Sequence, residues 1–192
     1  GTQQKVEILK ALYLNARVLI MDEPTAVLTP QEIDTLMEFV RRYVEQGNSV
    51  VFITHKMREV MAVSDTIVVM RNGSICGTVK KTHMMIGREL ETLEKPGTED
   101  MSNRRVRLAV KDLSIKPKDH TPLLEDINFE IHEREVLGFA GVSDNGQQEL
   151  CEAIYGGIPI TSGKIELDGE DVTNESVKDR IKLGMGYAAA DR

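Results

Sequence analysis

Arg17-Val-Leu-Ile-Met-Asp-Glu-Pro24 is the stretch that decides the predicted fold class. Its four consecutive apolar residues, from Val18 to Met21, are too few for a buried helix and suit a strand covered on both faces. Such strands are typical of parallel sheets in α/β proteins, so we expect a mostly parallel core sheet. Asp22 and Glu23 then fall at the carboxyl end of the strand, where open α/β sheets bind ligands.

The adjacent acids Asp22 and Glu23 suit chemistry on a nucleotide. The first acid of such a pair can hold Mg²⁺ on the nucleotide, directly or through water, and the second can polarise an attacking water. A strand end followed by an acidic turn, with no catalytic role, explains the same residues. The pair alone does not decide between these alternatives.

The composition indicates ordinary globular material. The chain has 192 residues, 41% hydrophobic and 29% charged, which fits one or two domains. Its net charge is −7, so the chain as a whole lacks the excess of basic residues that is typical of a nucleic-acid binder. Cys76 and Cys151 show no metal-ligand spacing and predict reduced thiols in a cytosolic protein. No apolar run approaches the roughly 20 residues that span a bilayer, so a membrane role needs a partner.

A helix and a second buried strand are predicted after the acidic pair. Thr29-Pro-Gln-Glu32 has the residues of a capping box, and the helix should stop at Gly47. Its buried stripe is predicted to comprise Ile33, Leu36, Met37, Val40 and Val44. Residues 49 to 54 then read as a strand that delivers His55 at its end.

Further along, residues 56 to 63 predict a short helix. Residues 66 to 70 and 74 to 79 flank Arg71-Asn-Gly73 and predict a hairpin with an Asn-Gly turn. Alternation in 106 to 115 and partial alternation in 123 to 131 predict strands.

Four elements in this order resemble those of an ABC ATPase. Gly1-Thr-Gln-Gln-Lys-Val-Glu7 resembles the end of the ABC signature (LSxGxQQ), and 18 to 24 resembles a Walker B strand with its glutamate. Thr25 to Thr29 falls at the D-loop, and Ile53-Thr-His55 resembles the switch-histidine strand. Four elements in sequence over about 55 residues are far more specific than one apolar run. The resemblance implies a P-loop NTPase fold of the ABC type, with an antiparallel β subdomain beside the core sheet.

The resemblance also implies a role for each residue. Asp22 would serve Mg²⁺, Glu23 the hydrolytic water and His55 the γ-phosphate of ATP. A histidine that ends a strand is more often structural, but its place after the acidic pair reverses that preference. The nucleotide-binding residues at the signature end would be Gly1, Thr2 and Gln3.

A boundary is predicted near residue 100. Glu94-Lys-Pro-Gly-Thr-Glu-Asp100 has the charge and turn residues of a linker. Met84 to Leu90 resembles the tail of the first nucleotide-binding domain in tandem ABC proteins of sugar and nucleoside importers. We therefore expect residues 1–90 to be the C-terminal half of a first ABC domain, 91–105 a linker and 106–192 the N-terminal half of a second.

The second segment contains a loop that resembles a P-loop, whose N–H groups cradle phosphate. Gly141-Val-Ser-Asp-Asn-Gly-Gln-Gln148 joins a predicted strand to a predicted helix at 147 to 155. The pattern GxxxxGK[ST] requires a lysine and a hydroxyl where this chain has glutamines, and Asp144 adds a negative charge. A bare strand-turn-helix is the alternative. The candidate nucleotide-binding residues here are Gly141, Asn145, Gly146, Gln147 and Gln148.

The last predicted elements are a hairpin at 163 to 169 and a strand within 184 to 192 that resembles the approach to the Q-loop. Ala189 and Ala190 replace the Pro-Glu that this family often has there.

The resemblance implies the ATPase subunit of an importer for simple sugars or nucleosides, which uses ATP and Mg²⁺. Its partners would be transmembrane permease subunits and a substrate-binding protein, with no nucleic acid. The subunit would be cytoplasmic, held at the inner face of the membrane by the permease. The chain starts without methionine and looks cut at both ends, so alone it should be inactive. One alternative is a noncatalytic module that binds nucleotide or a partner through a degenerate P-loop. Another is an ABC protein of DNA repair or translation, against which the net charge argues.

The two halves are expected to be complementary. Each alone would expose a face and an edge of a parallel sheet, which soluble proteins rarely tolerate. We therefore predict a composite sheet with the loop 141 to 148 beside Asp22, Glu23 and His55. It could form within one chain or by a domain swap in a homo-oligomer, and the sequence does not choose.

Overall fold

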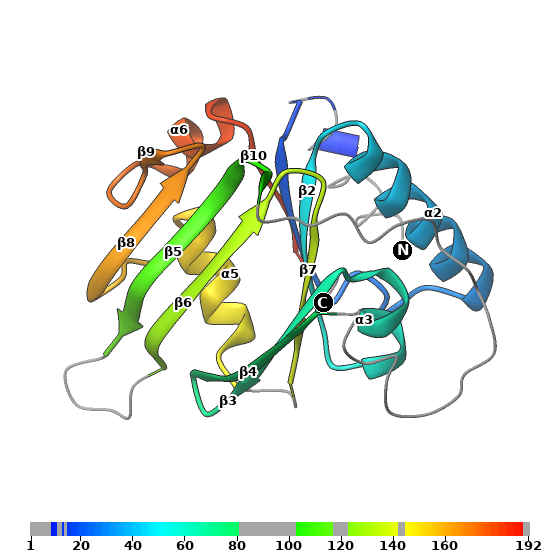
Figure 1. Cartoon of the computed structure of the whole chain (residues 1–192), viewed down its shortest axis with the longest axis horizontal. Coiled ribbons are helices and arrows are strands. Elements are labelled where there is room, and N and C mark those ends of the chain that lie inside the picture. The colour runs from blue at the N-terminus through cyan, green and yellow to red at the C-terminus, as the bar shows by residue number, and fades with distance from the viewer. Residues whose placement is uncertain are drawn as a thin grey trace.

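The computed structural model describes residues 15–80, 103–116, 123–141 and 145–189, together with residues 9, 10 and 13. Several predicted features lie outside the described residues: the signature end, the tail at 84–90, the linker at 94–100, Asp144 and Ala190. The described elements form two sheets with helices between them and on one side (Figure 1).

The first sheet has six strands, and the parallel ones dominate. In spatial order they are β10 (Met185–Ala188), β1 (Val18–Asp22), β2 (Ser49–Thr54), β7 (Val136–Ala140), β3 (Thr66–Arg71) and β4 (Ser74–Lys80). All neighbouring pairs are parallel except β3 and β4, which form the predicted hairpin. Asn72 and Gly73 at its turn have φ values of 49° and 73°, the left-handed backbone that an Asn-Gly turn supplies. The prediction of a mostly parallel core sheet is confirmed.

Strands from both halves of the chain take part in this sheet. β7 lies between β2 and β3, with pairs from Val50↔Val136 to Thr54↔Ala140. β10 closes the other edge by pairing with β1. The predicted composite sheet is therefore present, and of the two arrangements left open this structure has the one within a single chain.

Alternate residues of β1 supply two cores, one on each face of the sheet. Leu19 and Met21 pack with α2 (Pro30–Glu45), whereas Val18 and Ile20 pack with α5 (Gln147–Tyr155). This division explains why the strand is apolar without interruption, since both faces are covered. α3 (Met57–Val63) lies on the same side as α2, and α5 lies between the two sheets (Figure 1).

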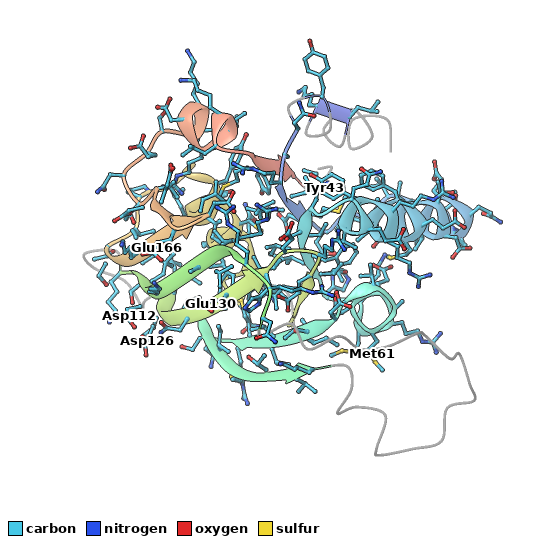
Figure 2. The ribbon with its side chains drawn as sticks, turned by 45° about the horizontal axis from the view of Figure 1, so that its top comes forward. Tyr43, Met61, Asp112, Asp126, Glu130 and Glu166 are labelled. Carbon is cyan, nitrogen blue, oxygen red and sulfur yellow. The ribbon has the colours of Figure 1, made fainter. Side chains whose placement is uncertain are left out.

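The predicted capping box begins α2. The Thr29 hydroxyl accepts from the Glu32 N–H, and the Glu32 carboxylate accepts from the Thr29 N–H at 3.0 Å. The predicted buried stripe needs a correction: Ile33 and Val44 are only partly buried, and Tyr43 is buried instead. The Tyr43 hydroxyl donates to the Ala16 carbonyl, which ties α2 to the chain before β1 (Figure 2). Burial raises the pKa of Tyr43 far above its ordinary value.

The second sheet is antiparallel, as predicted. Its strands, in spatial order, are β6 (Leu124–His132), β5 (Val106–Ile115), β8 (Ser162–Leu167) and β9 (Glu170–Asp171). The alternation expected along β5 is wrong, because the register shifts between Val110 and Leu113 and leaves two consecutive exposed residues there. Asp112 at this irregularity has φ 50°. The remaining helix is α6 (Val177–Lys182), which precedes β10.

A charged cluster joins the two sheets. The buried Arg107 on β5 donates to Asp168 Oδ1 and to Glu133 Oε1, each at 2.9 Å. Arg17, just before β1, reaches Asp168 Oδ2 at 2.8 Å. Because Arg17 and Asp168 come from different halves, this cluster adds a polar link to the apolar core of the composite fold.

Candidate functional site

The parallel pairing of β1 and β2 brings the predicted catalytic residues to one edge. Asp22 pairs with Ile53, and the Glu23 N–H donates to the Ile53 carbonyl at 2.9 Å. His55 follows two residues after Ile53, so it emerges beside Glu23. The carboxyl ends of parallel strands thus place an acid and an imidazole together, as the sequence predicted.

Three donors surround the Glu23 carboxylate. Glu23 Oε1 lies 2.8 Å from His55 Nδ1 and accepts from the His55 main-chain N–H at 2.9 Å. The Thr54 hydroxyl donates to Oε2 at 3.2 Å. Glu23 is 25% exposed and His55 is 49% exposed, so the pair is oriented by the protein yet open to a ligand.

The backbone of Glu23 is held in an uncommon conformation. Its φ of 44° lies in the left-handed region, which disfavours a residue with a side chain by about 1–3 kcal/mol. Such a conformation persists only where surrounding contacts impose it, and it occurs most often at functional sites. Here it turns the carboxylate from the strand towards His55.

Asp22 is more deeply placed, with 6% exposure. The Tyr187 hydroxyl on β10 lies 3.5 Å from Asp22 Oδ2, and the Tyr187 ring packs 5.0 Å from that of Tyr155. Burial, and then the charge of Asp22, raise the pKa of the Cys151 thiol on α5. Burial likewise raises the pKa of Tyr187, so both groups stay neutral beside the carboxylate.

A divalent cation at Asp22 would need ligands from elsewhere. Within the residues described here, no group of three His, Cys, Asp or Glu side chains could hold a metal ion. One carboxylate at a sheet edge still fits Mg²⁺ bound mainly by nucleotide phosphates and water, because Mg²⁺ typically takes only one or two protein carboxylates. Asp22 is the residue that would serve it.

The loop after β7 begins beside His55 but is engaged with its own chain. Ala140 pairs with Thr54, so Gly141 starts the loop next to the end of β2. The Asn145 N–H donates to Gln147 Oε1 at 3.0 Å. A Cβ at Gly141 would collide with Gln147 Nε2, which shows that the Gln147 side chain lies over the start of the loop. One N–H that could cradle phosphate therefore already has an acceptor.

Other contacts fix the same loop to the β3–β4 turn. Asn145 Oδ1 accepts from the Asn72 N–H at 2.7 Å, and the Asn145 carbonyl accepts from the Gly73 N–H at 3.1 Å. Gly146 starts α5 with φ 93°. Gln148 donates to Glu152 Oε1 at 2.9 Å, along the helix. These contacts hold the turn before α5 in place.

Sequence reasoning missed three residues behind the acidic pair: Thr25, Lys56 and Glu59. They bond to one another beside Glu23 and His55. The available signal was a threonine two residues after the glutamate, with charged residues directly after the histidine.

The chain is similar to import ATP-binding proteins over its whole length. It is 42% identical to a glucose import ATP-binding protein of Haloferax volcanii, covering 100% of this chain and 36% of that protein. It is 38% identical to a nucleoside import ATP-binding protein of Lactococcus lactis, covering 100% of this chain and 39% of that protein. A ribose import ATP-binding protein of Rubrobacter xylanophilus is 39% identical, with coverages of 99% and 39%. No protein-family model matches the chain.

Together with the α/β fold, these similarities show that the chain is homologous to the ATP-binding proteins of ABC transporters. More particularly, its relatives are the sugar and nucleoside import ATP-binding proteins, as the sequence resemblance implied. The chain spans well under half of the length of the relatives described above.

Proposed function

We propose that this chain is part of the ATP-binding subunit of an ABC importer for a simple sugar or a nucleoside. The observation that carries the proposal is the contact of Glu23 with His55 at the carboxyl edge of parallel strands. The similarity to import ATP-binding proteins over the whole chain supports it.

In the proposed parent protein, residues 1–90 are the C-terminal half of a first ABC domain, 91–105 are a linker and 106–192 are the N-terminal half of a second ABC domain. The greater length of the relatives supports this division. Each half would then pack on its own missing half, using the strand edges that β2 and β7 share here.

The proposed roles follow from the geometry of the edge. Glu23 would orient and polarise the attacking water, because its carboxylate is already held by three donors. His55, exposed on the same edge, would contact the γ-phosphate. Asp22 would hold Mg²⁺, which neutralises charge on the phosphates when bound. The signature residues Gly1 to Gln3 would contact nucleotide.

The loop 141–148 has a different proposed role. Its Asn145 N–H is occupied by Gln147, and neither glutamine supplies the charge of the missing lysine. We assign it a structural part in the second domain, so hydrolysis at Glu23 would use a lysine-bearing P-loop that this sequence does not contain. The same contacts weigh against the alternative of a noncatalytic module that binds nucleotide through this loop.

The proposed partners are permease subunits in the membrane and a substrate-binding protein. In the described part of the chain, no helix is long and apolar enough to cross a bilayer. In this proposal the permease holds the subunit at the inner face of the membrane.

The test compares phosphate release by residues 1–192 with release by the longer reading frame that contains them. The short chain should show background rates, and the longer protein should show Mg²⁺-dependent hydrolysis that His55→Ala strongly reduces. Metal-dependent release by the short chain that disappears on Glu23→Gln would contradict the need for a second P-loop. Absence of hydrolysis in the longer protein would overturn the ATPase proposal.

A further inference from the structure

A second set of contacts joins the acidic loop, defined here as residues 23–29, to the start of α3. The Thr25 hydroxyl donates to Glu59 Oε2 at 2.5 Å. Lys56 Nζ donates to the Thr25 hydroxyl and to the Thr25 carbonyl, each at 3.2 Å. Lys56 Nζ also lies 3.3 Å from Glu59 Oε1. The three side chains form a closed triangle.

Two members of this triangle are shielded from water, whereas the Lys56 side chain is 36% exposed. Thr25 is fully buried, and the Glu59 side chain is 11% exposed. A hydroxyl can donate once and accept twice, and Thr25 uses both capacities here. Charge-assisted hydrogen bonds in such surroundings are stronger than neutral ones, and removing Lys56 would leave the shielded Glu59 carboxylate without its cation.

The triangle lies directly behind the catalytic pair. Thr25 is two residues from Glu23, and Lys56 adjoins His55. Within the acidic loop, the Ala26 N–H donates to the Glu23 carbonyl at 3.2 Å, so Thr25 lies inside a hydrogen-bonded turn that begins at Glu23. Because the left-handed backbone of Glu23 must be imposed by its surroundings, this second attachment bears on its geometry.

We propose that Lys56, Glu59 and Thr25 are positioning residues that fix the acidic loop on α3 and thereby set the contact between Glu23 and His55. The catalytic meaning of that contact rests on the proposed function. The positioning itself rests only on contacts among residues 23 to 59, so it holds whether the halves pack with each other or with other segments.

The first experiment reads the His55 imidazole in residues 1–192 by long-range ¹H–¹⁵N correlation. Glu23→Gln gives the reference spectrum for an altered contact. Thr25→Val and Lys56→Met should move the His55 nitrogen signals towards that reference. Thr25→Ser keeps the hydroxyl and should give the wild-type spectrum. Arg58→Met removes a cation from the exposed side of α3 and should also leave the His55 signals unchanged.

Unchanged His55 signals in folded Thr25→Val and Lys56→Met would overturn the proposal. Protected amides of β2 show that each variant is folded, and Lys56→Met keeps the proposal testable if Thr25→Val unfolds. In the longer protein, Lys56→Met should lower kcat about tenfold with KM for ATP unchanged, since slight misplacement of reacting groups is costly. A wild-type protein without hydrolysis would refute the proposed function, whereas the spectra decide the positioning separately.

Discussion

Phe139 of β7 pairs in parallel with Ile53 of β2, although the two residues lie on opposite sides of the segment 81–102. This pair places a strand of the second half in the centre of a sheet that the first half begins. The side chains of α5 pack in one apolar core with those of β1 and β7. Cys151 of α5 is fully buried in that core. The reactivity of Cys151 therefore reports on the composite packing.

We expect a thiol reagent at pH 8 to label Cys76 quickly and Cys151 only after unfolding. Cys76 is exposed, whereas burial raises the pKa of Cys151 and removes both access and thiolate. Mass spectrometry of the native chain, with denatured protein as the control, measures both sites. Equal labelling would contradict the packing of the halves, and light scattering showing a dimer instead of a 21.5-kDa monomer would point to a swap.

Gly138→Ala should destabilise the chain by about 1–3 kcal/mol, as overpacking of a core does. A Cβ at Gly138 would collide with the Ser64 side chain and lie 2.6 Å from Val60 Cγ1 on α3. Gly77→Ala is the matched control, because nothing lies within 4 Å of a Cβ there. Urea unfolding measures both, and equal stability of the two variants would refute the close contact of α3 with β7.

The second sheet should lose stability on the acid side through Glu166. A hydrogen bond from Lys111, then one from Lys164, lower the pKa of Glu166 below its ordinary 4.5. A lowered pKa means that the contribution is complete above about pH 4.5 and is lost as the pH falls through the folded value.

Glu166→Gln should therefore reduce Tm above pH 4.5 and flatten its decline below that pH. Glu130→Gln, on strand β6 of the same sheet, is the control (Figure 2). If Tm declined equally with pH in the wild type and in Glu166→Gln between pH 7 and 3, the result would contradict the ion pairs with Lys111 and Lys164.

Restoring the P-loop pattern should increase ATP affinity. Gln147→Lys and Gln148→Ser with Asp144→Gly would remove the carboxamide that now accepts from Asn145 and supply charge-assisted contacts worth roughly 1.5–3 kcal/mol each. Calorimetry with ATP measures the change. The single variant Gln147→Ala is the control, because it removes the carboxamide from the loop without adding a cation. Unchanged ATP binding by the triple variant would count against the resemblance to a P-loop.

The sequence predicted the buried strands because their apolar runs are local signals, and it predicted the hairpin because Asn72-Gly73 specifies its turn. It also placed Glu23 and His55 at one edge from the parallel-sheet rule. The hydrogen bond between Thr25 and Glu59 could not be predicted from these residue types alone, because it depends on how the loop after β1 packs on α3. The bulge in β5 escaped for the same reason: alternation describes a regular ladder, and Asp112 interrupts it.

The most direct measurement is kcat for ATP hydrolysis by the longer protein carrying Glu23→Gln, with ATP binding measured in parallel. Removing the carboxylate that would polarise water should reduce kcat by about a hundredfold or more, while the Kd for ATP stays unchanged. Glu38→Gln, an exposed acid on α2 paired only loosely with Arg42 at 3.9 Å, should leave both constants as in wild type. A Glu23→Gln variant that hydrolyses ATP at the wild-type rate would contradict a catalytic role for the Glu23–His55 edge.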